Sequence, residues 1–206
     1  MGRFYAGVFA ILGWGTVVGQ YFASHTGSLA DAVDYFSYFT ILSNILVAST
    51  LTSAALAPRS SVGKFLLRPG ITMATAVYIS VTGLTYFLIL SSLYDLQDWV
   101  LVFDRLLHYV MPPAYVVFWL LFVPRGQLEL KNALWALIPP IVYACYTFVH
   151  GPWSGFYPYP FVDLPKIGVW NTARNVVEFI VFFYVTGVFY VAVDRLVARL
   201  RGGISS

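Results

Sequence analysis

The stretch Val100-Leu-Val-Phe-Asp104-Arg105-Leu-Leu-His108 opens an apolar run that continues to Val123. A run of about 20 residues is long enough to cross the hydrocarbon core of a bilayer as a helix. Ionisable side chains are costly there unless they pair with one another or serve a function. On a helix, Asp104 and His108 share one face because they are four residues apart, and Arg105 lies on its flank. We therefore interpret the rest of the chain as a scaffold that holds this cluster inside a membrane.

The composition is that of an integral membrane protein. Of the 206 residues, 59% are hydrophobic and 10% are charged, and the mean hydropathy is +0.76, whereas a soluble domain carries roughly 25% charged residues. The net charge of +3 does not indicate nucleic-acid binding, because the basic residues occupy short loops and form no single patch. The expected surroundings are a lipid bilayer, and the oligomeric state stays open.

Metal-binding and redox patterns are missing from the sequence. Cys145 is the only cysteine, so no intramolecular disulfide can form. The histidines, His25, His108 and His150, are scattered and match no metal-ligand spacing. We predict neither a metal nor another cofactor.

Six apolar stretches are candidates for membrane-spanning helices and predict an all-α, six-helix bundle formed by the whole chain as a single domain: 4–23, 35–57, 71–94, 100–123, 134–149 and 171–193. The first is longer than the apolar part of a signal peptide and lacks an Ala-x-Ala cleavage site, so we expect it to be retained. Continuous apolar runs argue against a β-barrel. Pro112-Pro113 and Pro139-Pro140 should bend the fourth and fifth helices.

The loop charges predict an orientation. One side of the membrane carries nine basic residues and the other only Lys166, which by the positive-inside rule makes both termini cytoplasmic. The nine are Arg3, Arg59, Lys64, Arg68, Arg125, Lys131, Arg195, Arg199 and Arg201. The longest external connection, 151–170, contains four prolines and many aromatic residues, so we expect a stiff segment that can act as a lid.

Polar side chains of three spans are expected at a similar depth, roughly 5–15 Å below the outer boundary at ~1.5 Å per residue. Beside the Asp104–His108 cluster of the fourth span, they are Thr40, Ser43 and Asn44 in the second and Arg174, Asn175 and Glu178 in the sixth. Each also has a structural interpretation: a membrane threonine commonly bonds to its own helix, and ion pairs can simply lock a bundle. The coincidence in depth favours a site in the outer half of the membrane.

The residue types in this cluster suit acyl transfer. A histidine is the usual base that activates a hydroxyl near neutral pH, so Thr40 is a candidate nucleophile and His108 its base. Asp104, one helical turn before His108, can orient the imidazole. Asn44 or Arg174 can donate to an oxyanion or hold a substrate carboxylate. A substrate that reaches such a site from the bilayer would be an acyl lipid.

Three segments resemble the androgen-induced-gene family of integral membrane proteins and its bacterial relatives: Tyr38-Phe-Thr40-Ile-Leu-Ser-Asn44, His108-Tyr-Val-Met-Pro-Pro113 and Gly155-Phe-Tyr-Pro-Tyr-Pro-Phe-Val-Asp163. Animal members are threonine hydrolases that act on fatty acid esters of hydroxy fatty acids. The resemblance implies that Thr40 is the nucleophile and His108 the base. Arg105 stands where the animal pattern carries a second histidine, and the Tyr-Pro-Phe element has no assigned step.

The sequence thus predicts a membrane hydrolase that opens a lipid ester through an acyl-Thr40 intermediate, in the cytoplasmic membrane of a bacterium if the chain is one of the bacterial relatives. The alternative is a lipid-binding protein or a proton or anion transporter that uses the same polar cluster, and a third is a purely structural membrane protein. A transporter needs a polar route to the cytoplasm. The inner halves of the second, fourth and sixth spans offer little beyond Ser49, Thr50, Thr52, Ser53 and Thr186, which favours a one-sided site.

Overall fold

The computed structural model describes residues 1–24 and 27–202, and within these ranges all regular structure is helical. Six helices are long and apolar enough to cross a membrane. The predicted all-α class and the number of spans are confirmed. The spans are Gly2–Ser24, Phe39–Leu56, Pro69–Leu90, Asp98–Phe122, Leu130–Ser154 and Leu164–Arg201.

Several spans consist of more than one helical element. The first and second are α1 (Gly2–Ser24) and α3 (Phe39–Leu56), and the third joins α5 (Pro69–Thr85) to a π-helical turn, η1 (Tyr86–Leu90). The fourth comprises α6 (Asp98–Arg105), the π-helical η2 (Leu106–Val110) and α7 (Met111–Phe122). The fifth is α8 (Leu130–Trp135) with α9 (Ile138–Ser154), and the sixth is α10 (Leu164–Gly202). Short connecting helices are α2 (Leu29–Phe36), α4 (Ser61–Leu66) and η3 (Pro160–Val162).

The boundaries depart from the predicted ones by several residues in most spans, and three of the differences have a visible cause in the local structure. Residues 35 and 36 belong to α2, which Ser28 and Asp31 start with a reciprocal capping box, so the second span begins only at Phe39. The fifth span breaks between α8 and α9, before its prolines, because Pro139 and Pro140 fit the first turn of α9. Helical structure of α10 begins at Leu164, seven residues before the predicted start at 171, but Gly168 has the non-helical angles φ 76° and ψ 162° and kinks the chain there, so the long part of α10 follows Gly168.

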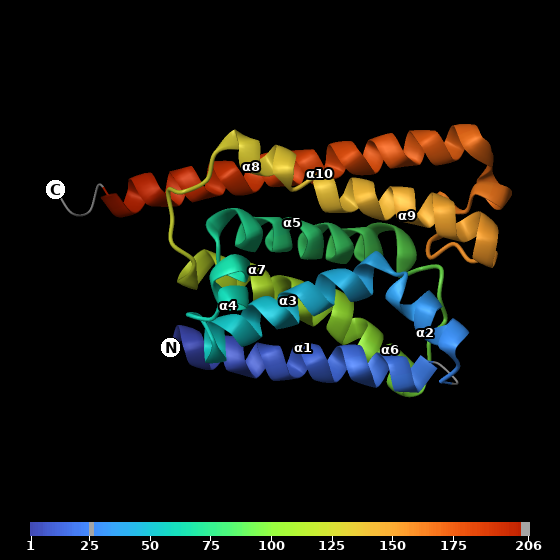
Figure 1. The fold of residues 1–206 in the computed structure, drawn as a ribbon, viewed down its shortest axis with the longest axis horizontal. Coiled ribbons are helices and arrows are strands. Elements are labelled where there is room, and N and C mark those ends of the chain that lie inside the picture. Colours follow the sequence, from blue (N-terminus) through green and yellow to red (C-terminus); the bar gives the residue numbers. More distant parts are fainter. Residues whose placement is uncertain (25–26, 203–206) are drawn as a thin grey trace.

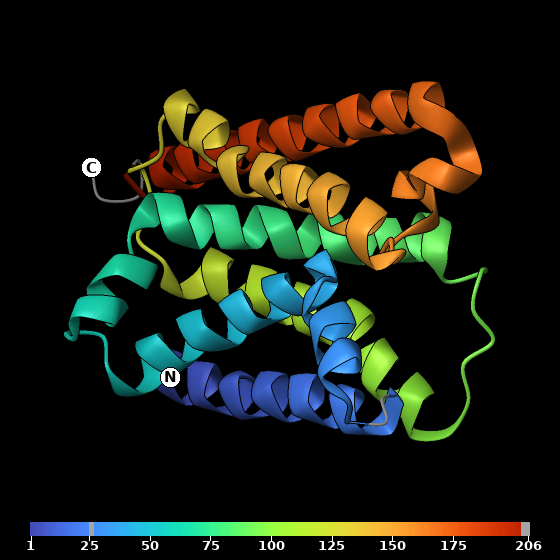
Figure 2. The same cartoon turned by 45° about the vertical axis from the view of Figure 1, so that its right-hand side comes forward.

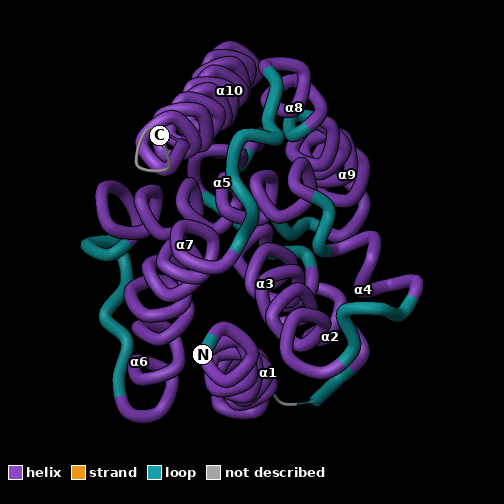
Figure 3. The backbone as a smooth tube through the Cα atoms, turned by 90° about the vertical axis from the view of Figure 1, so that its left-hand side faces the viewer, coloured by secondary structure: helices purple, strands orange, loops and turns teal. Residues whose placement is uncertain are grey.

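The spans surround α5, as the end-on view of Figure 3 shows. Helices α8, α9 and α10 lie on one side of α5, and α1, α3, α6 and α7 lie on the other (Figures 1 and 2). The apolar window of the third span is accordingly 72% buried, against 22% for the sixth. The start of α1 and the end of α10 lie at the same end of the bundle (Figure 1).

A buried ion pair fixes the loop between α7 and α8 at this end. Arg125 lies 3.8 Å from the carboxylate of Asp194 on α10, and its guanidinium stacks over Trp119 at 3.7 Å. The other carboxylate oxygen of Asp194 accepts hydrogen bonds from the backbone N–H of Gly126 and Leu128, each 3.0 Å long. Arg125 was expected as a loop charge, and its burial against Asp194 was not.

Candidate active site

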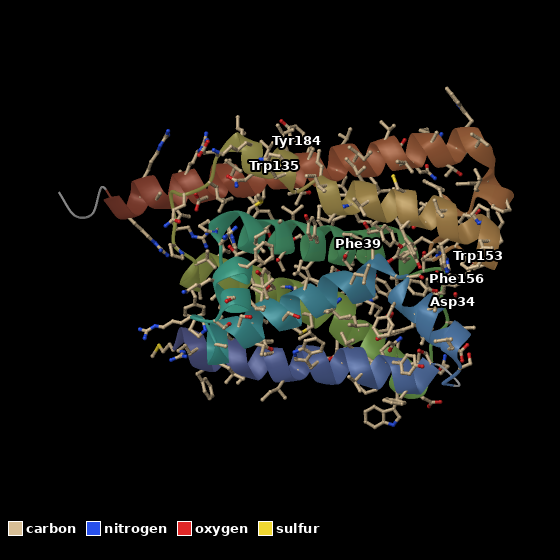
Figure 4. The ribbon with its side chains drawn as sticks, in the orientation of Figure 1. Asp34, Phe39, Trp135, Trp153, Phe156 and Tyr184 are labelled. Atoms are coloured by element: carbon tan, nitrogen blue, oxygen red, sulfur yellow. The ribbon has the colours of Figure 1, made fainter. Side chains whose placement is uncertain are left out.

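Thr40 lies in the first turn of α3 and is buried. The backbone of Tyr38 is extended, with φ −79° and ψ 127°, so the chain leaves α2, turns and starts α3 immediately before Thr40. The first backbone N–H groups of a helix have no partner within it and carry the positive end of the helix dipole. Thr40 therefore combines a hydroxyl with a backbone donor at an electropositive position. Its neighbour Phe39 lies between α3 and α5 (Figure 4).

His108 belongs to the π-helical turn η2. Pro112, four residues later, has no N–H to donate to the carbonyl of His108, so the ordinary α-helical pattern cannot continue there. The opposing helix comes close because residue 83 is glycine: a Cβ at Gly83 would lie 3.1 Å from the Pro112 side chain and 3.2 Å from the His108 carbonyl oxygen. Turns of this kind are frequent at functional sites.

The imidazole of His108 connects Asp104 to Thr40. Nδ1 lies 2.9 Å from the backbone carbonyl oxygen of Asp104 and 3.2 Å from its carboxylate, and Nε2 lies 3.4 Å from Oγ1 of Thr40. Since both groups facing Nδ1 are acceptors, that nitrogen carries the proton in the neutral ring, and Nε2 is left to accept from the hydroxyl. All three residues are buried. The structure thus brings together the predicted nucleophile, base and orienting carboxylate.

Tyr159 completes this group, and the sequence analysis assigned it no role. Its hydroxyl lies 3.0 Å from the backbone nitrogen of Thr40 and 3.1 Å from Oγ1. Pro158 and Pro160 flank it, and a residue before a proline favours the extended conformation that Tyr159 has, with φ −135° and ψ 145°. Its ring stacks on Phe161 at 5.1 Å. Burial raises the pKa of the Tyr159 hydroxyl, so it remains a neutral phenol able to donate.

Two cavities meet at Thr40, and Leu90 and Tyr159 line both. One, of about 90 Å³, is walled almost entirely by apolar side chains of α3, α5, α9 and α10. The other, of about 300 Å³, contains His108 and Asp104 and more polar groups of α1 and of the connecting segments at this end of the bundle. Thr40 is therefore accessible from an apolar side and from a polar side.

Asn44 and Ser43 support Thr40. Nδ2 of Asn44 donates to the carbonyl oxygens of Thr40, at 2.9 Å, and of Leu107, at 3.5 Å, which ties α3 to η2. The hydroxyl of Ser43 lies 3.0 Å from the Thr40 carbonyl and 3.1 Å from Thr82 Oγ1. Because the amide N–H groups of Asn44 face backbone carbonyls, its position is that of a structural support and not of an oxyanion donor.

The basic residues and Glu178 do not join this group. Arg105 is exposed and lines a separate cavity with Asp95 and Tyr109. Arg174 and Glu178 form an exposed pair with 3.5 Å between their charged atoms and line neither cavity at Thr40. The depth of Arg174 and Glu178 in the membrane does not determine which face of α10 they occupy, and both lie on its exposed face. Asn175 has an indirect link, since its Nδ2 donates to the carbonyl oxygen of Phe161 at 2.8 Å and so holds the segment that carries Tyr159.

Within 1–24 and 27–202, no three His, Cys, Asp or Glu side chains gather closely enough to hold a metal ion. His150 lies near the end of α9, 3.1 Å from the hydroxyl of Ser154. His25 is outside the residues that the structure describes. Trp153 and Phe156, just before the Tyr159 segment, lie at the end of the bundle that also holds Asp34 of α2 (Figure 4).

Comparison of the chain with protein-family models, curated proteins and solved structures finds no match.

Proposed function

We propose that this chain is an integral membrane hydrolase that cleaves a lipid ester, with Thr40 as nucleophile and His108 as base. The observation that carries the proposal is the hydrogen-bonded series from Asp104 through His108 to Thr40, which ends at the wall of an apolar cavity. A hydroxyl, a base and a group that orients the base are the parts that covalent acyl transfer requires. The resemblance to the androgen-induced-gene family points to the same two residues.

In the first half of the reaction, His108 Nε2 takes the proton of the Thr40 hydroxyl while Oγ1 attacks the ester carbonyl carbon. The tetrahedral intermediate collapses as its bond to the alcohol oxygen breaks, and His108 returns the proton to that oxygen. The products are a free alcohol and an acyl-Thr40 ester. Asp104 stabilises the imidazolium that exists between these two proton transfers.

In the second half, a water molecule loses a proton to His108 Nε2 and attacks the acyl carbon. Collapse of this intermediate releases the fatty acid, and His108 returns the proton to Oγ1 of Thr40. The net reaction is ester plus water to acid plus alcohol, which needs no oxidant, reductant or co-reactant.

The two cavities suggest how the substrate is divided. The acyl chain would occupy the apolar cavity between α5, α9 and α10, because burying methylene groups there is favourable. The alcohol would occupy the cavity that contains His108, since that residue must protonate it. We take the substrate to be a fatty acid ester of a hydroxy fatty acid, as the resemblance implies.

The alternative, a lipid-binding protein or a proton or anion transporter, finds less support. As a transport path it would use Arg174 and Glu178 together with Asp104 and His108. The first two are exposed on α10 and line neither cavity that contains Thr40. Lipid binding without hydrolysis is the outcome to expect if the experiment below fails.

The experiment is hydrolysis of a fluorogenic long-chain ester by the purified, detergent-solubilised protein. We expect Thr40→Ala and His108→Ala to lose the activity with melting temperatures close to that of the parent, and Thr40→Ser to retain part of it. The matched control is Thr50→Ala, because Thr50 lies in the same helix, its hydroxyl donates to the carbonyl of Leu46, and it lines neither cavity at Thr40. Activity that persists in folded Thr40→Ala contradicts the nucleophile assignment.

A further inference from the structure

The Tyr159 hydroxyl lies within hydrogen-bonding distance of both the backbone nitrogen and the side-chain hydroxyl of Thr40. It accepts a hydrogen bond from the Thr40 backbone N–H at 3.0 Å and lies 3.1 Å from Oγ1. When Oγ1 donates to His108, Tyr159 is left to donate to Oγ1. The N–H of Thr40 thus points at the Tyr159 oxygen and the O–H of Tyr159 at the nucleophile, so both donors lie in one small region beside Oγ1.

We propose that the Tyr159 hydroxyl and the Thr40 backbone N–H form the oxyanion site of this hydrolase, with the ester carbonyl oxygen displacing the hydrogen bond that these two groups make to each other in the free protein. This inference rests on the proposed function. The carbonyl carbon must come to Thr40 where the two cavities meet, and the residues shared by both cavities are Thr40, Leu90 and Tyr159. Leu90 has no polar side-chain group, so at this junction the side-chain and backbone donors are those of Tyr159 and Thr40.

The donors that the sequence analysis offered for this role, and the neighbouring Ser43, are engaged elsewhere or distant. The amide of Asn44 bonds to the carbonyls of Thr40 and Leu107. The hydroxyl of Ser43 is engaged with the Thr40 carbonyl and with Thr82. The guanidinium of Arg174 is exposed beside Glu178 and is not part of either cavity.

Tyr159 is held rigidly enough to serve as a preorganised donor. Prolines on both sides limit its backbone, its ring lies parallel to that of Phe161 with 5° between the planes, and the edge of Tyr38 packs on it at 5.6 Å. A donor fixed in this way costs little reorganisation when negative charge develops on the substrate oxygen. The first-turn position of Thr40 adds the positive end of the α3 dipole.

The test uses a long-chain alkyl fluorophosphonate, a probe that does not require the natural substrate to be known. Thr40 Oγ1 forms a bond to phosphorus, fluoride leaves, His108 takes the hydroxyl proton, and the phosphoryl oxygen occupies the oxyanion position. We expect Tyr159→Phe to lower the rate constant of labelling by about 10²–10³, the loss typical of one oxyanion donor. KM for a fluorogenic ester should change little while kcat falls. The control is Tyr78→Phe, which removes a buried hydroxyl that donates to the Ala136 carbonyl and lies outside both cavities.

The outcomes separate this inference from the proposed function. Labelling of the parent that disappears in Thr40→Ala but continues unchanged in folded Tyr159→Phe overturns the oxyanion site alone. A parent that is not labelled and hydrolyses no ester overturns both. If Tyr159→Phe fails to fold, Asn175→Ala decides, because it loosens the segment carrying Tyr159 by removing the bond to Phe161. A drop of about tenfold in its labelling then supports the inference, and an unchanged rate contradicts it.

Discussion

The ring of Tyr86 lies parallel to the imidazole of His108, with 3.8 Å between the ring centroids and 13° between the planes. Each residue belongs to a π-helical turn, Tyr86 to η1 and His108 to η2. Two distortions in neighbouring helices therefore bring one aromatic face against the proposed base. The stack leaves the edge of the imidazole free, so that both nitrogens can be used.

Loss of this stack should impair the reaction more than the fold. In Tyr86→Leu the imidazole loses a contact worth about 0.5–1.5 kcal/mol and gains freedom to rotate, so we expect kcat for ester hydrolysis to fall by about tenfold. Tyr86→Phe keeps the ring and should stay close to the parent. Equal activities of the Leu and Phe variants would show that the stack does not hold the base.

Asp104→Asn should reduce activity without abolishing it. The backbone carbonyl of residue 104 already accepts from His108 Nδ1 at 2.9 Å, so the tautomer is retained when the carboxylate is lost. What disappears is the charge that stabilises the imidazolium, and we expect kcat to fall by about 10–100-fold, a cost of about 1.4–2.8 kcal/mol. A variant as inactive as His108→Ala would mean that the carboxylate, and not the backbone, sets the tautomer.

Gly83→Val should separate α5 from the fourth span. Its side chain would begin 3.1 Å from Pro112 and 3.2 Å from the His108 carbonyl, and such overpacking costs about 1–3 kcal/mol. We expect a lower melting temperature and slower fluorophosphonate labelling. Gly15→Val is the control, since no atom lies within 4 Å of the position its Cβ would take. Similar losses in both variants would attribute the effect to the helix rather than to the close approach.

Asp194→Ala should destabilise the opposite end of the bundle. It leaves the Arg125 guanidinium buried without its counter-charge and frees the backbone N–H of Gly126 and Leu128, so we expect a loss of about 3–5 kcal/mol in unfolding free energy. Lys131→Ala breaks a pair with Glu129 that is 2.9 Å long but more than half exposed, and should cost less than about 1 kcal/mol. Labelling at Thr40 by folded protein should be the same in both.

The proposed orientation can be tested with single cysteines in a Cys145→Ala background. We expect a membrane-impermeant maleimide applied to intact cells to label Trp153→Cys, whose site is 89% exposed at the proposed outer end, and to leave Arg59→Cys unlabelled. Lysis of the cells should make Arg59→Cys reactive. The reverse pattern would invert the topology and place the site on the cytoplasmic side.

Hydropathy was sufficient to predict the spans, because helices that cross a bilayer must be long and continuously apolar. It did not predict the break at residues 37–38 or the short helical stretch 164–167 that precedes the kink of α10 at Gly168. Those boundaries depend on local bonds, such as the capping box of Ser28 and Asp31, that average hydropathy does not record.

The depth of polar residues placed Thr40 and His108 at one level and made a contact between them possible, but it could not show that contact or choose among the other candidates. Arg174 and Glu178 have the expected spacing, yet they face outward on a peripheral helix, and depth carries no information about that direction. Tyr159 was missed because it lies in a connection, where no periodicity applies. Two signals were available: the flanking prolines, which indicate a fixed, extended residue, and the Tyr-Pro-Phe element of the family resemblance, which contains Tyr159.

Tyr159 lies in the connection between the fifth and sixth spans, and this position has a consequence for the biosynthesis of the protein. A ribosome delivers Thr40 and His108 with the first four spans, before the segment that holds Tyr159 has been synthesised. A nascent or truncated chain thus contains the nucleophile and base without the third group. If Tyr159 is needed for turnover, the protein stays unable to attack the lipids around it until nearly all of it has been inserted.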